Sequence, residues 1–270
     1  MKVTYQGETG AYSEMAVYKF FGSKVEPVPS KDFREVFESV KTGAVPHGVV
    51  PIENSIEGSV NQNYDLFLAY DLKVCGEVAL KLAHVLITNP QTKLEDIKTV
   101  YSHPQALAQC RSYLEKHNWE IVPAYDTAGS VKLIKEKALL NAAAIASEKA
   151  ADLNDMKILA RNIADNLSNY TRFLVLSHED APPTGDDKTS IIFSAKHAPG
   201  TLYHALGEFA SRNINLTRIE SRPTKTTAWQ YNFYLDFEGH RTEKRCTEAL
   251  QALEKYATFV KILGSYPRVI

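Results

Sequence analysis

The sequence lacks most of the short motifs that mark redox, metal-dependent or nucleotide-dependent proteins. Its three cysteines, Cys75, Cys110 and Cys246, are far apart and form no CxxC pair, so neither a disulfide framework nor a structural zinc site is indicated. There is no glycine-rich loop of the Walker or dinucleotide-binding type, no GxSxG motif and no HExxH motif. We therefore expect a protein that works without a cofactor and without a metal ion.

The chain also lacks a long apolar run and a strong charge of either sign. No run approaches the roughly 20 residues that a membrane span needs, and Met1–Tyr5 leads into an expected strand instead of a secretion signal. The formal net charge is −1, so no overall field attracts nucleic acid or a membrane, and an anionic ligand must be held by local groups. With its unpaired cysteines, the chain is expected to be cytoplasmic.

What the sequence does contain is ordinary globular composition, with 270 residues of which 44% are hydrophobic and 23% charged. This length suffices for two domains. The segment HEDAPPTGDD at 178–187 is charged, contains two prolines and has no apolar periodicity, so it is interpreted as a linker. It separates residues 1–178 from residues 188–270, with the linker proper at 179–187.

The larger part alternates between strand and helix patterns, which predicts parallel sheets with right-handed crossovers. Strands are expected at 3–6, 48–52, 99–102, 121–124 and 142–146, and helices at 11–21, 63–69, 104–116, 127–136 and 147–152. A further helix, carrying Phe33, Val36, Phe37 and Val40 on one face, is expected to be capped by Ser30.

A long extended run at 74–87 is interpreted as a crossover between two lobes. The stretch SNYTRFLVL, Ser168–Leu176, is the expected return. Lobe one then comprises about 1–77 plus 168–178, and lobe two about 78–167. The second half of SNYTRFLVL has the apolar pattern of a buried strand, but its first half is polar. We expect that polar end to lie at the hinge of a cleft.

The smaller part predicts the order β-α-β-β-α-β, a ferredoxin-like arrangement. Strands are expected at 189–195, 216–222, 229–237 and 260–265, with helices at 200–213 and 243–257 and a polar turn at 224–227.

Several strand-to-helix junctions in the larger part are rich in small and polar residues, and two of them contain glycine. They are GETGAYSE at 7–14, SHPQA at 102–106, DTAGS at 126–130 and ASE at 146–148. Helix N-termini supply unpaired N–H donors for a carboxylate or phosphate, and such junctions gather at the carboxyl ends of strands. Each polar residue here has the alternative role of capping its helix, but at least one junction is expected to contact a ligand.

The segment PIENSIEGSV at 51–60 places donors and acceptors directly after an expected buried strand. Glu53 and Glu57 resemble an acid–base pair, with two solvated glutamates as the alternative. His103 is either a general acid or a capping or packed residue. His84 alternates with Leu82 and Leu86, which favours a satisfied core histidine.

As a set, GAYSE, PIENSIEGSV, SHPQAL, DTAGSV and NYTRF, followed by PGTLYHAL and IESRP, resemble the prephenate dehydratase family with a C-terminal ACT regulatory domain. The resemblance covers nearly the whole chain. It implies an α/β fold: a two-lobed catalytic domain like a periplasmic binding protein, followed by a ferredoxin-like (βαββαβ) ACT domain. Because no chorismate mutase segment precedes Met1, we expect the single-function form. Ala11-Tyr12 and Thr201-Leu202-Tyr203 depart from common family residues, and bear on substrate choice and effector affinity respectively.

The resemblance implies decarboxylation and dehydration of prephenate to phenylpyruvate, with Thr171 as the hydrogen-bond donor that helps hydroxide leave. It also implies substrate contacts from Ser13, Glu53, Asn54, Ser55, His103, Gln105, Thr127, Ser147, Asn169, Arg172 and Phe173. Arg172 either pairs with a substrate carboxylate or ties the two lobes together. Phe173 is expected to pack the cleft wall.

For the ACT domain the resemblance implies feedback by L-phenylalanine bound between adjacent subunits. The residues implied are Gly200, Thr201, Leu202, Asn215, Leu216, Glu220, Ser221 and Arg222, in a homodimer or homotetramer. Two alternatives stay open. One is arogenate dehydratase, which performs the same reaction on the amino-acid analogue. The other is a non-catalytic amino-acid-sensing protein.

Overall fold

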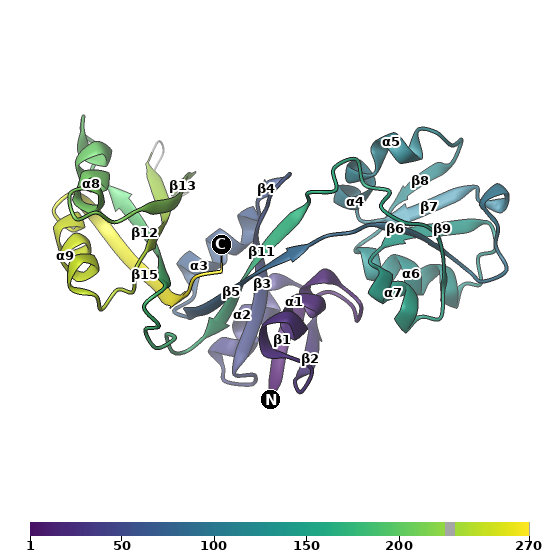
Figure 1. Ribbon diagram of the computed structural model, residues 1–270, viewed down its shortest axis with the longest axis horizontal. Helices are drawn as coiled ribbons and strands as arrows, with labels where there is room; N and C mark the ends of the chain where they lie inside the picture. Colours follow the sequence, from purple (N-terminus) through teal and green to yellow (C-terminus); the bar gives the residue numbers. More distant parts are fainter. Residues whose placement is uncertain (225–229, 270) are drawn as a thin grey trace.

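The computed structural model describes residues 1–224 and 230–269, and the chain forms three bodies in a row (Figure 1). Lobe one lies in the middle, with lobe two at one end and the C-terminal domain at the other. This confirms the expected fold class. Within the described residues, no helix is both long and apolar enough to cross a membrane.

Lobe one is a mixed sheet covered by helices. Its elements are β1 (Lys2–Gln6), α1 (Tyr12–Phe21), β2 (Glu26–Ser30), α2 (Phe33–Lys41), β3 (His47–Asn54), β4 (Gly58–Ser59), α3 (Asn61–Ala69), β5 (Lys73–Lys81) and β11 (Tyr170–Ser177). The strand order is β2-β1-β3-β11-β5, with β4 paired to β3. Strands β1 and β3 are parallel as predicted, and β2 is parallel to β1, but β11 runs antiparallel to both of its neighbours.

Strand β2 was missed by the sequence analysis, and the expected cap at Ser30 is wrong. The segment Glu26–Ser30 contains two prolines, which remove backbone donors, and β2 tolerates them because it is an edge strand. Ser30 ends this strand, with its Oγ 2.8 Å from Thr4 Oγ1. The cap of α2 is Asp32, whose carboxylate accepts from Glu35 N at 2.9 Å.

Lobe two has its own mixed sheet, in the order β10-β6-β9-β7-β8. Its elements are β6 (Val85–Thr88), a 3₁₀ turn (Leu94–Asp96), β7 (Thr99–Ser102), α4 (Pro104–Gln109), α5 (Arg111–Leu114), β8 (Glu120–Pro123), α6 (Thr127–Glu136), β9 (Ala142–Ala146), α7 (Glu148–Leu153) and β10 (Lys157–Ala160). Strands β8, β7 and β9 are parallel, whereas β6 is antiparallel to β9 and β10.

The single helix expected at 104–116 is broken between α4 and α5. The return segment toward lobe one interrupts its hydrogen bonding: Asp165 N donates to Gln109 O at 2.8 Å, and the Asp165 carboxylate accepts from Ser112 N at 3.1 Å. Two helical backbone groups are thereby satisfied by a distant segment, and the helix turns at Cys110.

The two lobes are joined by two chain crossings, one between β5 and β6 and one before β11. The crossings lie side by side, because Leu82 N donates to Asn169 O at 2.8 Å and Ile163 N donates to His84 O at 3.2 Å. Strand β5 stays in the lobe-one sheet as far as Lys81, so the first crossing is 82–84, a few residues beyond the boundary expected at 77/78.

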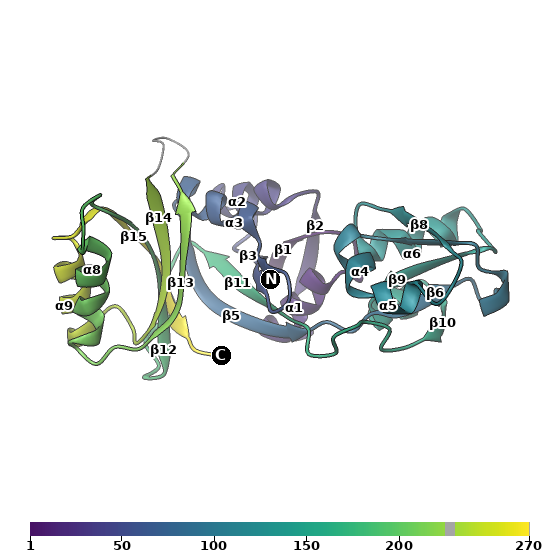
Figure 2. The ribbon, with the colours of Figure 1, turned by 90° about the horizontal axis from the view of Figure 1, so that it is seen from above.

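The C-terminal domain has the element order β12 (Asp187–Ala195), α8 (Thr201–Ala210), β13 (Leu216–Pro223), β14 (Tyr231–Glu238), α9 (Lys244–Leu253) and β15 (Ala257–Pro267). Its antiparallel sheet, β13-β14-β12-β15, stands between helices α8 and α9 and lobe one (Figure 2). On the lobe-one face, Tyr234, Leu263 and Tyr266 share an apolar cluster with Phe67 and Leu174. Most of the expected turn at 224–227, and the expected strand start at 229, lie outside the described residues.

Candidate active site

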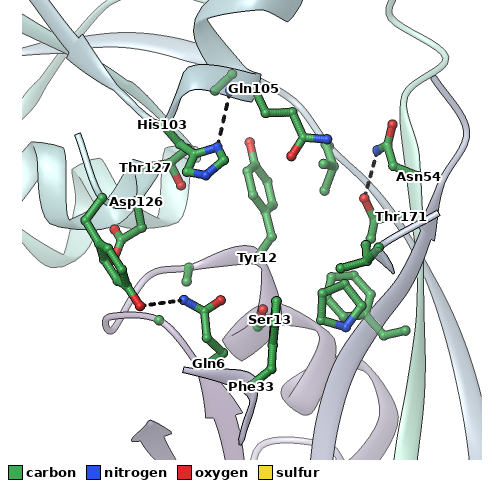
Figure 3. A pocket seen from close by; sticks show the side chains of 18 of the residues that line it. Gln6, Tyr12, Ser13, Phe33, Asn54, His103, Gln105, Asp126, Thr127 and Thr171 are labelled. Atoms are coloured by element: carbon green, nitrogen blue, oxygen red, sulfur yellow. Dashed lines mark hydrogen bonds between the residues drawn. The ribbon is translucent and has the colours of Figure 1, made fainter. Parts of the chain in front are cut away.

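A cavity of about 440 Å³ lies between the two lobes. Its wall is built from the start of α1, the ends of β3 and β11, and the junctions β7–α4 and β8–α6, as Figure 3 shows. Of the residues expected at the site, the structure brings seven to this wall: Ser13, Asn54, His103, Gln105, Thr127, Thr171 and Phe173. Side chains from both lobes therefore face one shared cleft, which suits a small ligand with polar groups.

The geometry around Asn54 determines the hydrogen-bonding role of Thr171. Asn54 Oδ1 accepts from the backbone N–H groups of Ile56 and Glu57 at 2.9 and 3.0 Å. Its Nδ2 must then face the other way, and it donates to Thr171 Oγ1 at 2.9 Å. The Thr171 hydroxyl accepts this bond and keeps its own proton to donate. Among residues 1–224 and 230–269, no acceptor forms a hydrogen bond with that proton.

A hydrogen-bonded chain of buried side chains extends from this pair across the hinge. Asn54 Nδ2 also donates to Asn169 Oδ1 at 2.7 Å, and Asn169 Nδ2 donates to Gln109 Oε1 at 2.9 Å. Gln109 Oε1 lies 2.8 Å from His84 Nε2, and His84 Nδ1 lies 3.1 Å from the Tyr12 hydroxyl. Because Gln109 Oε1 only accepts, His84 carries its proton on Nε2.

The cavity wall carries several polar side chains but no fixed cation among its described lining residues, which include neither lysine nor arginine. Burial lowers the pKa of both His84 and His103, so both are neutral near pH 7. Burial also raises the pKa of the Asp126 carboxyl, with Glu8 adding to the shift while Gly129 N–H opposes it. Positive potential must therefore come from backbone amides.

Two helices present such amides to the cavity. Neither α1 nor α3 has a side-chain cap at its N-terminus, and Tyr12 and Ser13 at the start of α1 line the wall, as do Val60 and Gln62 around the start of α3. By contrast, the starts of α2, α4 and α6 are capped by Asp32, His103 and Asp126. Among these described helices, α1 and α3 are left with unpaired N–H groups, which suit an anion.

The remaining expected substrate contacts are not on the cavity wall. Ser147 is buried, caps α7 through Ala150 N at 3.1 Å and donates to Gly10 O at 2.9 Å. Ser55 accepts from Tyr170 N at 2.9 Å near the surface. Asn169 is fully buried behind Asn54 and acts in the hydrogen-bonded chain described above.

Glu53 and Arg172 face away from the cavity. They are cross-strand partners one step along from the pair Asn54 and Thr171, and successive residues of a strand point to opposite faces. Arg172 donates to Glu77 at 2.7 Å and to Asp236 of the C-terminal domain at 2.6 Å. These contacts match neither of the two roles weighed for Arg172, because they join lobe one to the C-terminal domain and not to lobe two. Glu57, the other half of the suspected acid–base pair, is exposed and does not line the cavity.

Comparison with known proteins agrees with this geometry. A family model described as "Prephenate dehydratase" matches residues 3–181, and one described as "ACT domain" matches residues 189–255. A protein named prephenate dehydratase from Methanocaldococcus jannaschii is 44% identical, covering 98% of this chain and 97% of that protein. The chain belongs to the prephenate dehydratase family.

Two further relatives of this family bear on function. "Arogenate dehydratase/prephenate dehydratase 2, chloroplastic" of Arabidopsis thaliana is 44% identical, covering 99% of this chain and 72% of that protein. A crystal structure described as prephenate dehydratase from Arthrobacter aurescens in complex with L-Phe has a TM-score of 0.91 at 33% identity. It covers 99% of this chain and 90% of that chain.

Several cavity residues were missed by sequence reasoning, and one was judged only as core. Gln109 follows Gln105 by four residues, which places both on one face of α4, so this spacing was a usable signal. His84 is buried, as expected for a core histidine, yet it also lines the cavity. Gln6, Tyr12, Gln62, Tyr125 and Asp126 also reach the wall. Tyr12 lies within the GAYSE motif and Asp126 opens DTAGS, so the sequence marked the segments but not these two side chains. The surroundings of Gln6, Gln62 and Tyr125 are ordinary, and only the closure of the two lobes brings them to the wall.

The expected regulatory residues of the ACT domain fall into three places. Gly200 starts α8, and Thr201 and Leu202 line a separate hollow of about 160 Å³ with Tyr231 and Phe233. Asn215 and Leu216 lie at the other end of the sheet, because Leu216 pairs with Phe237 whereas Pro223 pairs with Tyr231.

The IESRP segment is itself divided by the strand pleat. Ser221 is exposed, whereas Glu220 and Arg222 contact the catalytic domain: Ser59 donates to Glu220, and Arg222 donates to Asn61. The same segment therefore contributes to the interface with lobe one.

Proposed function

We propose that the chain is a prephenate dehydratase whose reacting group is the Thr171 hydroxyl, held in the cavity between the lobes. The observation that carries this proposal is the fixed orientation of Asn54. Because its amide N–H group points at Thr171 Oγ1, the Thr171 oxygen accepts that hydrogen bond. The hydroxyl proton is then available for donation to a ligand. A donor positioned in the cleft between the lobes is what the departure of hydroxide requires.

The reaction itself needs little acid strength. Loss of CO2 leaves an electron pair that aromatises the ring as the ring C–O bond breaks, and the departing hydroxide takes up a proton to leave as water. A threonine hydroxyl is too weakly acidic to release that proton freely. We assign it the role of a positioned donor within a proton relay, with Asn54 Nδ2 stabilising its oxygen. In a site from which water is excluded, such a bond is stronger than in bulk water.

Two carboxylates of the substrate must also be held, and the uncapped starts of α1 and α3 supply the donors for them. Ser13, Gln105 and Thr127 add side-chain donors from both lobes. Since the described lining has no lysine or arginine, the dianion is bound by neutral donors and helix N-termini. Phe173, which is buried at the wall, contacts the ring.

Arogenate remains a competing substrate, and one observation favours it. Asp32 and Asp126 line the cavity, and a carboxylate suits the ammonium group that arogenate carries in place of the keto group of prephenate. The two substrates are distinguished by measuring kcat/KM for each with the purified protein, following phenylpyruvate absorbance at alkaline pH or phenylalanine release. We expect prephenate to be preferred. If the protein turns over neither substrate, the non-catalytic amino-acid-sensing alternative is left.

Regulation by L-phenylalanine is the second part of the proposal. Gly200–Leu202 and Asn215–Leu216 lie at opposite ends of one ACT sheet, so a single chain cannot close both around one amino acid. A second copy turned end for end would bring the two sets together. We therefore propose a homodimer or homotetramer in which phenylalanine binds between ACT domains.

A further inference from the structure

Directly behind the pair Asn54 and Thr171 lie four charged side chains that join the catalytic sheet to the ACT sheet. Glu53 and Arg172 are cross-strand partners on β3 and β11, next to Asn54 and Thr171. Arg218 and Asp236 are cross-strand partners on β13 and β14 of the ACT domain. We call Glu53, Arg172, Arg218 and Asp236 the quartet.

Ion pairs across the domain interface connect the two halves of the quartet. Arg218 Nε lies 3.1 Å from Glu53 Oε2, and Arg172 Nη1 lies 2.6 Å from Asp236 Oδ2. Each residue of the reacting pair is thus the chain neighbour of a side chain held by the ACT domain. A displacement of β13 or β14 relative to lobe one must therefore move Glu53 or Arg172. It must also move the strand ends that carry Asn54 and Thr171.

Three members of the quartet are tightly enclosed, whereas the Glu53 side chain is 38% exposed. The side chains of Arg172 and Asp236 are each 8% exposed, and that of Arg218 is 12% exposed. Burial opposes the charge on Asp236, but the Arg172 and Arg218 guanidinium groups hold its pKa below the usual range. Glu77, Lys188, Ser190 and Tyr266 complete the polar surroundings of Arg172 and Asp236. The buried and paired part of this network, around Arg172 and Asp236, does not tolerate rearrangement of one member alone.

Arg218 makes a second contact with the hairpin formed by β3 and β4. Its Nη2 donates to Ser59 Oγ at 3.0 Å, and Ser59 on β4 pairs with Glu53 on β3. Its guanidinium lies 4.8 Å from the ring centroid of Tyr64 on α3. Arg218 therefore contacts both strands of the 53–59 hairpin and the helix that follows, while Asn54 and Val60 of the same segment line the cavity.

We propose that Arg218 and Asp236 of the ACT domain are positioning residues for the Thr171 hydroxyl, acting through Glu53 and Arg172. The inference rests on the proposed function and adds the contacts through which the ACT sheet affects kcat. None of the four side chains lines the cavity, so their effect is on the orientation of Asn54 and Thr171 and not on substrate contacts. A shift of these strands that leaves substrate binding intact lowers kcat without raising KM.

The test uses the full chain and the variants Arg218→Met, Arg218→Lys and Arg241→Met. Arg241→Met is the matched control, because Arg241 also pairs an ACT-domain guanidinium with a carboxylate outside that domain, Asp180 of the linker. Steady-state kinetics are measured well below the thermal unfolding temperature of each variant, and L-phenylalanine binding is measured by calorimetry alongside inhibition.

We expect Arg218→Met to lower kcat by about 10- to 100-fold with KM within twofold of the wild type. Arg218→Lys restores part of the loss, and Arg241→Met changes neither constant. Phenylalanine still binds Arg218→Met but inhibits it less, a separation that a merely destabilised protein would not show. If Arg218→Met does not fold, Ser59→Ala is judged by the same criteria, with an expected loss in kcat of about fivefold.

A kcat for Arg218→Met within twofold of the wild type, or an equal loss in Arg241→Met, would overturn the inference while leaving the proposed function standing. So would a rise in KM at constant kcat. Absence of prephenate and arogenate turnover in the wild type would instead remove the proposed function, and the inference with it.

Discussion

At the scale of single residues, the site depends on which way a few polar groups point. In β11, alternation of side chains puts Thr171 toward the cavity and Arg172 toward the ACT domain. That division follows from the strand period and was available from the sequence. The orientation of the Asn54 amide was not, because it is set by backbone N–H groups of the turn that follows. Nor was the cavity position of His84, which alternates with apolar residues like a core residue.

His84 gives a prediction about pH and stability. Burial lowers its pKa below the ordinary 6.5, so below about pH 6.5 the unfolded chain binds a proton that the folded chain does not. The contribution of His84 to the free energy of unfolding therefore falls as the pH drops from 7.5 to 5.5. Other histidines with lowered pKa, among them His47, contribute in the same direction.

The variant His84→Gln isolates the contribution of this residue. In urea unfolding followed by circular dichroism, we expect the decrease in stability between pH 7.5 and 5.5 to be smaller in His84→Gln than in the wild type. An identical decrease in the two proteins would contradict the assignment of a neutral, buried His84.

At the scale of elements, most strands and helices followed from apolar periodicity and capping residues. The exceptions have physical reasons. Strand β2 carries two prolines and forms only because it pairs with β1 at the edge of the sheet. The break between α4 and α5 depends on Asp165, more than fifty residues away. Long-range hydrogen bonds of this kind leave no local pattern in the sequence.

Closure of the two lobes over the cavity is expected to depend on the β8–α6 junction. Tyr125 of that junction donates to Lys31 O of lobe one, and Gln6 Nε2 lies 3.5 Å from its hydroxyl. Tyr125→Phe removes these contacts and leaves the ring. Because one exposed hydrogen bond is worth about 1 kcal/mol, we expect KM to rise by about two- to fivefold with kcat nearly unchanged. Unchanged KM in steady-state assays would show that this contact does not support the closed form.

At the scale of the whole molecule, the two domains and their types could be predicted, but their docking could not. The sequence gives no sign that Arg172 pairs with Asp236 or that Glu53 pairs with Arg218, because each of these residues by itself resembles an ordinary charged side chain. The mixed direction of both sheets also departs from the parallel sheets expected from strand–helix alternation. It arises because the chain leaves lobe one and returns to it, so that β11 enters between β3 and β5.

The division of the regulatory residues between the two ends of the ACT sheet leads to a prediction about assembly. Size-exclusion chromatography with light scattering is expected to give a mass of at least twice the 30.2 kDa of one chain. Phenylalanine is expected to favour the associated form, because the proposed binding site lies between chains. A monomer at micromolar concentration with phenylalanine present would contradict the shared site.

The central claim is that the Thr171 hydroxyl donates to the hydroxide that leaves the substrate. The most direct measurement is kcat on prephenate for the wild type, Thr171→Ser and Thr171→Ala, each checked for native circular dichroism. We predict that Thr171→Ala loses ~10²-fold or more in kcat, while Thr171→Ser, which keeps a hydroxyl beside Asn54, retains measurable turnover. A folded Thr171→Ala variant with near-normal kcat would contradict the account.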